Sequence, residues 1–476
     1  MRVAHLVSFV LGAPLLVASF VACGSEAPGS SFNDGTTPSD SRDDPNGAFD
    51  NNGGGKDCVG IACKQVDCGT PGVTTTVTGI VTAPNGTLPL YNAVVFVPQE
   101  PLAPIAQGAS CEQCGSVSGK PLVSAVTGVD GRFELKDVPV GDDIPLVIQI
   151  GKWRRQVTLP KVDKCVENKI TDSNMTRLPR NQAEGDIPRI AITTGRCDQL
   201  ACLLPKLGLD ASEFTPSDGN GRLHLYRGAA HPNSAPIAAP APTGTLDATT
   251  LYAGGSAALS KYDILMLSCE CGEHDETKPP AAKEALYDFT TKGGRVFASH
   301  FHYTWADQGP LGQTAQWMGS ASNPENPPGP YMVDQSFPKG AAFAQWLVGV
   351  QASSTLGEIP ISQPRENVGG VVSPAQRWVY RSTSNPIVPQ STKYMSVNTP
   401  IGQPVENQCG KFVFADMHLY GGDVQDPSTA LPNDGFPGSC SKDLTPEEKA
   451  LAFLFFDLSS CIQDDAAAPK APPEIR

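Results

Sequence analysis

The first residues of the chain decide the compartment in which the rest must fold. Arg2 is the only charged residue before an apolar run over residues 6–22. A positively charged N-terminal region followed by a short apolar run is typical of a secretory signal peptide, and this run is too short for a membrane-spanning helix. We therefore expect residues 1–22 to be a signal peptide and the mature chain to fold outside the cytoplasm.

The junction after this run predicts a lipid anchor. Ala22 precedes Cys23 in a sequence that resembles the bacterial lipobox, in which the cysteine carries the lipid; the alternative is an ordinary signal that leaves Cys23 as an incidental thiol. The next residues, up to 57, are almost free of apolar side chains and cannot bury a core, so 23–57 is expected to be a disordered tether. The Gly-Ser pair after the cysteine gives no inner-membrane retention signal, so we expect anchoring in the outer membrane, on its periplasmic face or at the cell surface.

Charge and cysteine content narrow the function classes. The net charge of −14 repels phosphate, which excludes a nucleic-acid-binding function. Of fourteen cysteines, thirteen remain when Cys23 is set apart, and in an oxidising compartment they are expected to form disulfides, with at least one cysteine left over. The sequence leaves their pairing open. The thirteen cysteines that are candidates for disulfide formation are Cys58, Cys63, Cys68, Cys111, Cys114, Cys165, Cys197, Cys202, Cys269, Cys271, Cys409, Cys440 and Cys461.

Two groups of closely spaced cysteines raise the alternative of metal or redox chemistry. Cys58, Cys63 and Cys68 lack the CxxC pairs and nearby histidines of zinc sites, which favours a disulfide knot. Cys111 and Cys114 have CxxC spacing, but they lie in a Gly/Ser-rich loop and not at the start of a helix. A local loop staple or another structural role is therefore favoured over a redox motif.

Residues 58–178 show short β-branched runs bounded by turn residues. The runs are VTTTVTGIV at 73–81, AVVFV at 93–97, GRFEL at 131–135 and LVIQI at 146–150. No helical period appears between them. The pattern predicts a Cys-rich collar followed by a small antiparallel β-sandwich.

Two longer segments of this domain, GIVTAPNGTLPLYNAVVFV and TGVDGRFELKDVPVGDDIPLVIQIGKW, resemble the carboxypeptidase regulatory-like domain. That domain is a transthyretin-like sandwich in the carbohydrate-binding-like fold group. The resemblance implies a folding, docking or sugar-binding module without catalysis, and this chain departs from it by an insertion at about 98–121. Trp153 beside Arg154 and Arg155 could form a ligand-binding patch; the alternative is an exposed strand end.

From 186 to 462 the pattern changes to strands alternating with helices. Five segments are continuous apolar runs, as expected for strands buried on both faces: IPRIAIT, RLHLY, YDILML, RVFAS and KFVFA. A helical period over 282–289 and a capping box at 445–448 mark two helices. We predict an α/β domain with a mostly parallel, flavodoxin-like or amidotransferase-like sheet. The stretch 305–400 is interpreted as an insertion over one edge, and 463–476 as a disordered tail.

Three blocks, YDILMLS, LYDFTTKGGRVFASHFHYTW and CGKFVFADMHLYG, resemble the class I glutamine amidotransferase-like fold and, within it, the trehalose-utilisation (ThuA-like) group. In amidotransferases a cysteine stands on the turn after the strand of the second block, and here the resemblance places His300 there. Imidazole cannot replace the thiolate nucleophile of glutamine hydrolysis. The resemblance therefore argues against amidotransferase activity.

Polar side chains follow three predicted strands, at the edge where α/β folds place their sites. His300 and His302 follow one strand, Asp416 and His418 another, and Glu270 a third. Such a set could perform acid–base catalysis, or could hold a divalent metal through His300, His302 and His418. No tight motif such as HExxH supports the cluster, so leftover polar residues in a binding-only fold are the favoured alternative.

Cys269 and Cys271 flank Glu270. Cysteines separated by one residue seldom pair with each other. Each is therefore expected to form a disulfide with Cys197, Cys202 or Cys409.

These features favour a lipid-anchored cell-envelope protein that binds a glycan or an envelope protein without catalysis, and that contacts the membrane through its anchor. One alternative is a sugar-active, metal-dependent enzyme built on the strand-end cluster. The other is a purely structural surface scaffold. The favoured function requires no cofactor, and the replaced cysteine argues against an enzyme.

Overall fold

A computed structural model describes residues 58–115, 117–195, 197–198, 200–229, 244–319, 325–383, 385, 390–418, 440 and 443–474. The expected signal peptide, Cys23 and the tether lie outside these residues. The described residues all belong to one compact unit. Within the described ranges, no helix has the length and apolarity needed to cross a bilayer.

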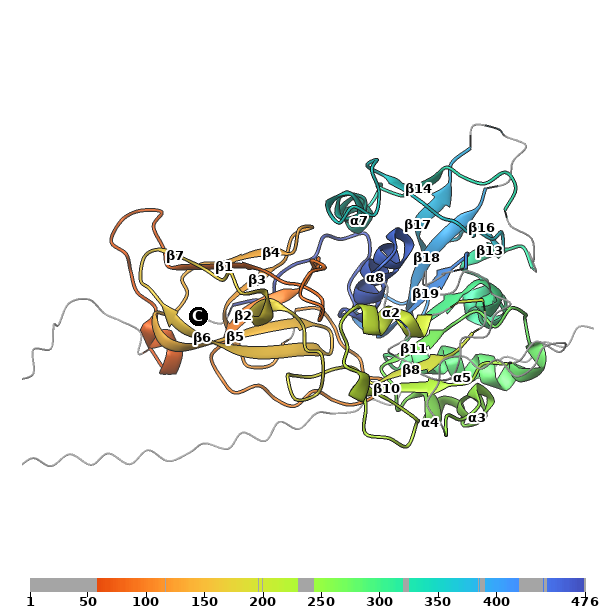
Figure 1. Ribbon diagram of the computed structural model, residues 1–476, viewed down its shortest axis with the longest axis horizontal. Helices are drawn as coiled ribbons and strands as arrows, with labels where there is room; N and C mark the ends of the chain where they lie inside the picture. Colours follow the sequence, from red (N-terminus) through yellow and green to blue (C-terminus); the bar gives the residue numbers. More distant parts are fainter. Residues whose placement is uncertain are drawn as a thin grey trace, which may run out of the picture. The chain divides into compact units, whose positions relative to one another are not determined.

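The first part of the described chain is a β-sandwich, as the short β-branched runs predict (Figure 1). One sheet has the order β4-β1-β7 and the other β3-β2-β5-β6. All strand pairs are antiparallel except β1 with β7. The strands are β1 (Thr76–Ile80), β2 (Val94–Pro98), β3 (Pro121–Val126), β4 (Arg132–Leu135), β5 (Gly141–Ile150), β6 (Trp153–Val162) and β7 (Glu167–Lys169), with the short helices η1 (Gly60–Lys64) and α1 (Ser173–Thr176) beside them.

The second part contains a ten-stranded sheet whose larger half is parallel. Its parallel strands follow the order β19-β12-β11-β8-β10-β9. The apolar runs read from the sequence coincide with five of them, and these five are buried along their whole length. The strands are β8 (Ile190–Thr193), β9 (Phe214–Thr215), β10 (Leu223–Tyr226), β11 (Ile264–Leu267), β12 (Arg295–Ser299) and β19 (Gly410–Ala415).

The stretch 305–400, interpreted above as an insertion without sustained period, supplies the rest of this sheet. Its strands add antiparallel to β19 in the order β18-β17-β14-β15, and a two-stranded sheet β13-β16 lies apart. The stretch thus extends the sheet at one edge of its parallel strands, through regular strands that the sequence pattern did not indicate. The elements are α6 (Gly309–Gly312), β13 (Ala315–Trp317), β14 (Tyr331–Val333), α7 (Pro338–Gly349), β15 (Glu358–Ile359), β16 (Val368–Val371), β17 (Gln376–Arg381) and β18 (Thr392–Thr399).

Helices cover both faces of the large sheet. In Figure 1, α2, α7 and α8 lie on the side of the sandwich, and α3, α4 and α5 lie on the other side. Helix α8 begins with the predicted capping box, in which Thr445 accepts from the backbone N–H of Glu448. The remaining elements are α2 (Leu200–Lys206), η2 (Ala211–Glu213), α3 (Ala248–Ala253), α4 (Gly255–Leu259), η3 (Asp275–Thr277), α5 (Pro280–Thr291), η4 (His300–Trp305), η5 (Val405–Asn407) and α8 (Pro446–Ser459).

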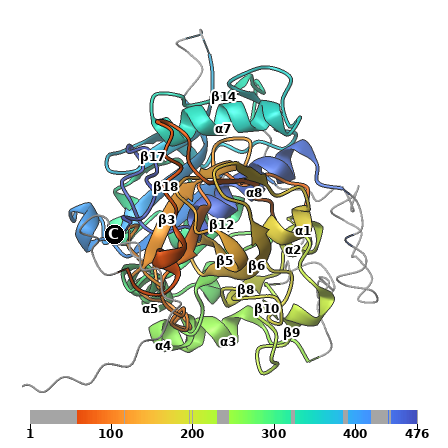
Figure 2. The same cartoon turned by 90° about the vertical axis from the view of Figure 1, so that its left-hand side faces the viewer.

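The sandwich and the large sheet share one hydrophobic core, which continues from β2 and β5 to the inner face of α8. Viewed from the sandwich side in Figure 2, β5 and β6 lie in front of α8. Tyr91 stacks on Phe453 of α8 with ring centroids 5.7 Å apart. The C-terminal segment also packs here: Asp465 is buried, which contradicts the expectation of a disordered tail over 463–476.

Six disulfides join the described cysteines and leave Cys269 as a buried thiol. Of the two structural alternatives for Cys111 and Cys114, the local staple was wrong, because both cysteines form disulfides with distant partners. The expectation of a disulfide for Cys269 was also wrong. Such extensive pairing indicates that the chain folds in an oxidising, exported environment. The pairs are Cys58–Cys63, Cys68–Cys165, Cys111–Cys409, Cys114–Cys461, Cys197–Cys271 and Cys202–Cys440.

Candidate functional site

His300 stands at the C-terminal edge of the parallel strands, directly after β12. Its φ of 37° lies in the left-handed region, which costs free energy for a residue with a Cβ. Its side chain is completely buried. The strand therefore ends in a strained turn that directs an imidazole into the interior.

His418, which follows β19, forms a pair with His300. Its Nε2 lies 2.7 Å from His300 Nδ1, and Arg365 Nη2 lies 2.9 Å from His418 Nδ1. Because a guanidinium can only donate, this contact favours the tautomer in which His418 Nε2–H donates to His300. Burial and the Arg365 charge lower the pKa of His418 to about 3, so this imidazole stays neutral.

The Cys269 thiol lies beside the pair of His300 and His418. Its Sγ lies 3.4 Å from His300 Nδ1, and the side chain is fully buried. Burial and the nearby Asp198 carboxylate raise the pKa of Cys269 well above its ordinary value, which disfavours a thiolate nucleophile. Asp198 Oδ2 accepts hydrogen bonds from the Cys269 N–H and from the Ser299 hydroxyl.

His302 does not join His300 and His418. Its Nε2 lies 2.8 Å from the Ser268 carbonyl oxygen, and its Nδ1 accepts from Trp305 Nε1 at 3.1 Å. Both ring nitrogens are therefore engaged within the protein. Burial lowers the pKa of His302 to about 4. The predicted metal set His300, His302 and His418 is thus not brought together.

Glu270 belongs to a separate ion pair. Its Oε2 lies 2.9 Å from Lys278 Nζ, its Oε1 accepts from the Ala229 N–H at 2.9 Å, and both charged side chains are buried. Burial alone would raise the pKa of Glu270, but His302 and Lys278 lower it overall. The ion pair lies within the segment between β11 and α5, and the hydrogen bond from the Ala229 N–H ties this segment to the one after β10.

Asp416 belongs to a third network, beside the antiparallel strands. Its Oδ2 accepts from the Val368 N–H at 3.0 Å and lies 3.7 Å from Lys393 Nζ, which also pairs with Glu325 at 3.1 Å. Burial raises the pKa of Asp416 to about 6. The five residues proposed from the sequence are thus divided: His300 and His418 form a pair, while His302, Glu270 and Asp416 each have other partners.

The aromatic–guanidinium patch proposed from the sequence does not exist on the surface. Trp153 is 1% exposed and packs edge-on against Phe455 and Phe456 of α8. Arg154 is buried and forms an ion pair with Asp186 at 2.8 Å, and Arg155 donates to the Asn174 carbonyl oxygen. Both the patch and its alternative, an exposed strand end, were wrong for Trp153.

An accessible candidate site lies instead on the sandwich, along β1, β4 and β7. We call it the sandwich groove, and its volume is about 970 Å³. Thr76 and Thr78 of β1 line it, since they alternate with the core residue Val77. Charged side chains of both signs, an aromatic ring and further hydroxyls also line it. These are Arg132, Phe133 and Glu134 of β4, Glu167 and Lys169 of β7, and Thr82, Thr87, Thr171, Ser173 and Thr176 from adjoining segments.

Cys269 also belongs to a group of potential metal ligands in the described part of the chain. One ligand atom each from Cys197, Cys269 and His418 lies within 4.8 Å of the others. Cys197 is already joined to Cys271 and cannot act as a thiolate. Cys269 was not predicted as a site residue, because the odd cysteine count requires one leftover thiol without indicating which cysteine it is.

Comparison with known proteins identifies no family. No family model and no curated protein matches the chain. Among solved structures, a cohesin–X-dockerin complex from Acetivibrio cellulolyticus is 17% identical over 31% of this chain and 79% of that chain, with a TM-score of 0.16. The dioxygenase domain of a dioxygenase–carbohydrate-binding protein fusion from Streptomyces sp. SirexAA-E is 16% identical over 34% and 82%, with a TM-score of 0.11. At such scores the likeness carries no argument about fold or function.

Proposed function

We propose that this chain is a cell-envelope lipoprotein that binds a glycan through the sandwich groove and catalyses no reaction there. The observation that carries the proposal is the groove itself, a polar concavity of about 970 Å³. That volume is in the range of small-molecule and cofactor sites. It leaves room for a short oligosaccharide.

The chemistry of the groove suits sugar hydroxyls, each of which donates and accepts a hydrogen bond. Threonine hydroxyls do both, while Glu134 and Glu167 only accept and Arg132 and Lys169 only donate. Thr78 Oγ1 already donates to Glu167 Oε1 at 2.6 Å, which orients the carboxylate along the groove. The resemblance of residues 79–97 and 127–153, which contain β4, β5 and most of β2, to a carboxypeptidase regulatory-like sandwich supports the same class of ligand.

Catalysis at the edge of the large sheet is disfavoured by burial and by internal hydrogen bonding. His300, His302 and Asp416 are each at most 1% exposed. The resemblance to the amidotransferase-like fold places His300 on its turn, where a thiolate is required for glutamine hydrolysis. We therefore assign no hydrolytic role to this edge.

The lipid anchor is part of the same proposal, with Cys23 as the modified residue and the outer membrane as the destination. Cys23→Ser is expected to move the protein from the membrane fraction to the soluble fraction, because the thioether-linked lipid can no longer form. Fractionation followed by immunoblotting measures this. Unchanged membrane association of the variant would contradict the anchor.

The test of the groove is a calorimetric titration with soluble peptidoglycan fragments. We expect Thr76→Val combined with Thr78→Val to weaken binding by about tenfold, since two neutral hydrogen bonds of about 0.5–1.5 kcal/mol each are lost. Valine keeps the shape and suits a strand, so β1 should persist. Thr158→Val, at an exposed position of β6 outside the groove, is the matched control and should bind like the wild type. Equal affinity of all three proteins would overturn the groove assignment.

A further inference from the structure

A second site lies in the large sheet and does not depend on the sandwich groove. We propose that Cys269, His300 and His418 bind one divalent transition-metal ion of the Zn²⁺ type. The residues follow β11, β12 and β19, three adjacent parallel strands. Their side chains therefore come from a rigid frame and not from a single loop.

The three ligand atoms converge closely enough to share one ion. Cys269 Sγ lies 3.4 Å from His300 Nδ1, which lies 2.7 Å from His418 Nε2. With Zn–S at about 2.3 Å and Zn–N at about 2.0–2.1 Å, tetrahedral ligand atoms are about 3.3–3.6 Å apart. The separation of Cys269 Sγ from His300 Nδ1 already fits, and a ring nitrogen of His418 lies within 4.8 Å of Cys269 Sγ. The two imidazoles need to separate by only about 0.6 Å.

The ligand types fit a metal of intermediate softness. A thiolate with two imidazoles suits Zn²⁺ and its neighbours in the first transition row, and not Ca²⁺ or Mg²⁺. Cys269 is the only thiol among the described cysteines, because the other twelve are in disulfides. The ion would thus be held by one sulfur and two nitrogens without reduction of any disulfide.

The neighbours of His418 allow the change of tautomer that metal binding requires. Coordination through Nε2 places the remaining proton on Nδ1, where Gln363 Oε1 at 3.2 Å is an acceptor. Arg365, which now donates to Nδ1, has to turn away. The Cys269 thiol releases its proton to solvent, so one proton leaves for each divalent ion that binds.

The experiment is a cobalt titration of the purified soluble chain with its disulfides intact. Co²⁺ bound to a thiolate gives a near-ultraviolet charge-transfer band that imidazole and carboxylate ligands do not give. We expect this band to saturate at one equivalent of Co²⁺ and to disappear when Zn²⁺ displaces cobalt. This measurement on the wild type requires no variant to fold.

Two variants and a control identify the ligands. Cys269→Ser should lose the band, and His418→Gln should weaken cobalt binding at least tenfold. His302→Gln should keep the wild-type titration, because both nitrogens of His302 bond within the protein. The proposal is overturned if the wild type binds no stoichiometric cobalt, if the band persists in Cys269→Ser, or if it appears only after a reductant frees Cys197 and Cys271.

Discussion

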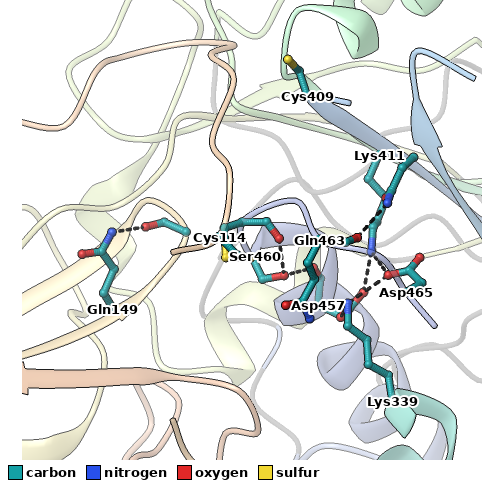
Figure 3. Close-up of a disulfide and its surroundings, with 12 residues drawn as sticks. Cys114, Gln149, Lys339, Cys409, Lys411, Asp457, Ser460, Gln463 and Asp465 are labelled. Carbon is teal, nitrogen blue, oxygen red and sulfur yellow. Dashed lines mark hydrogen bonds and ion pairs between the residues drawn. A yellow bond between two sulfur atoms is a disulfide. The ribbon is translucent and has the colours of Figure 1, made fainter. Parts of the chain in front are cut away.

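Asp465→Asn is expected to lower the free energy of unfolding by about 3–5 kcal/mol, the cost of removing one partner from a buried ion pair. Asp465 Oδ1 accepts from Lys339 Nζ at 2.9 Å and from Lys411 Nζ at 2.7 Å. The lysines also contact Asp457, and Lys339, Lys411 and Asp465 are buried (Figure 3). The variant leaves two buried ammonium groups with one carboxylate, and urea denaturation measures the loss.

The pH dependence of this loss follows from the direction of the pKa shift. Burial raises the pKa of Asp465, but Lys339 and Lys411 outweigh it and hold the pKa far below the ordinary value. A lowered folded pKa gives stability that is present above the unfolded pKa of about 3.9 and is lost as the pH falls below it. The gap between wild type and variant should therefore be full at pH 7 and shrink below pH 4.

The neighbouring Asp464→Asn is the control. Asp464 is exposed and caps only the Ala466 N–H, so its replacement should change the unfolding free energy by less than about 0.5 kcal/mol. Equal effects of the two substitutions would show that the buried ion cluster does not anchor the C-terminal segment.

Trp153→Ala is expected to cost about 3–5 kcal/mol, the range for truncating a buried aromatic side chain. The Trp153 ring lies 6.2 Å from the ring of Phe455 and 6.1 Å from that of Phe456, so it joins the sandwich to α8. Trp153→Phe keeps an aromatic ring and should lose less. Urea denaturation checks both. A stable Trp153→Ala protein that has lost glycan binding would instead support a ligand-binding role for this residue.

Five parallel strands of the large sheet could be predicted because each is visible in the sequence as a short run of neighbouring apolar residues. The apolar runs at β8, β10, β11, β12 and β19 are short and continuous, and the structure buries each of them. The strands of 305–400 were missed because prolines and serines between them break any period. The packing of the C-terminal segment was missed for another reason: the buried Asp465 and hydrogen bonds from Asn398 and Ser124 hold it, and not an apolar run.

Disulfides and side-chain contacts between residues far apart in the sequence could not be predicted from the spacing of the residues along the chain. Cys111 and Cys114 suggested a local staple, yet their partners are 298 and 347 residues away. His302 lies two residues from His300, but η4 turns the chain there and sends the two imidazoles to different partners. Only the folded sheet edge brings Cys269 to His300 and His418.

Hydrogen–deuterium exchange, with and without a saturating soluble peptidoglycan fragment, locates the ligand most directly. We expect slower amide exchange in β1, β4 and β7, because a bound glycan covers the sandwich groove and restrains its opening. The segments after β11, β12 and β19 should exchange as in the free protein. Protection confined to those segments, or no protection anywhere at saturation, would contradict glycan binding by the sandwich groove.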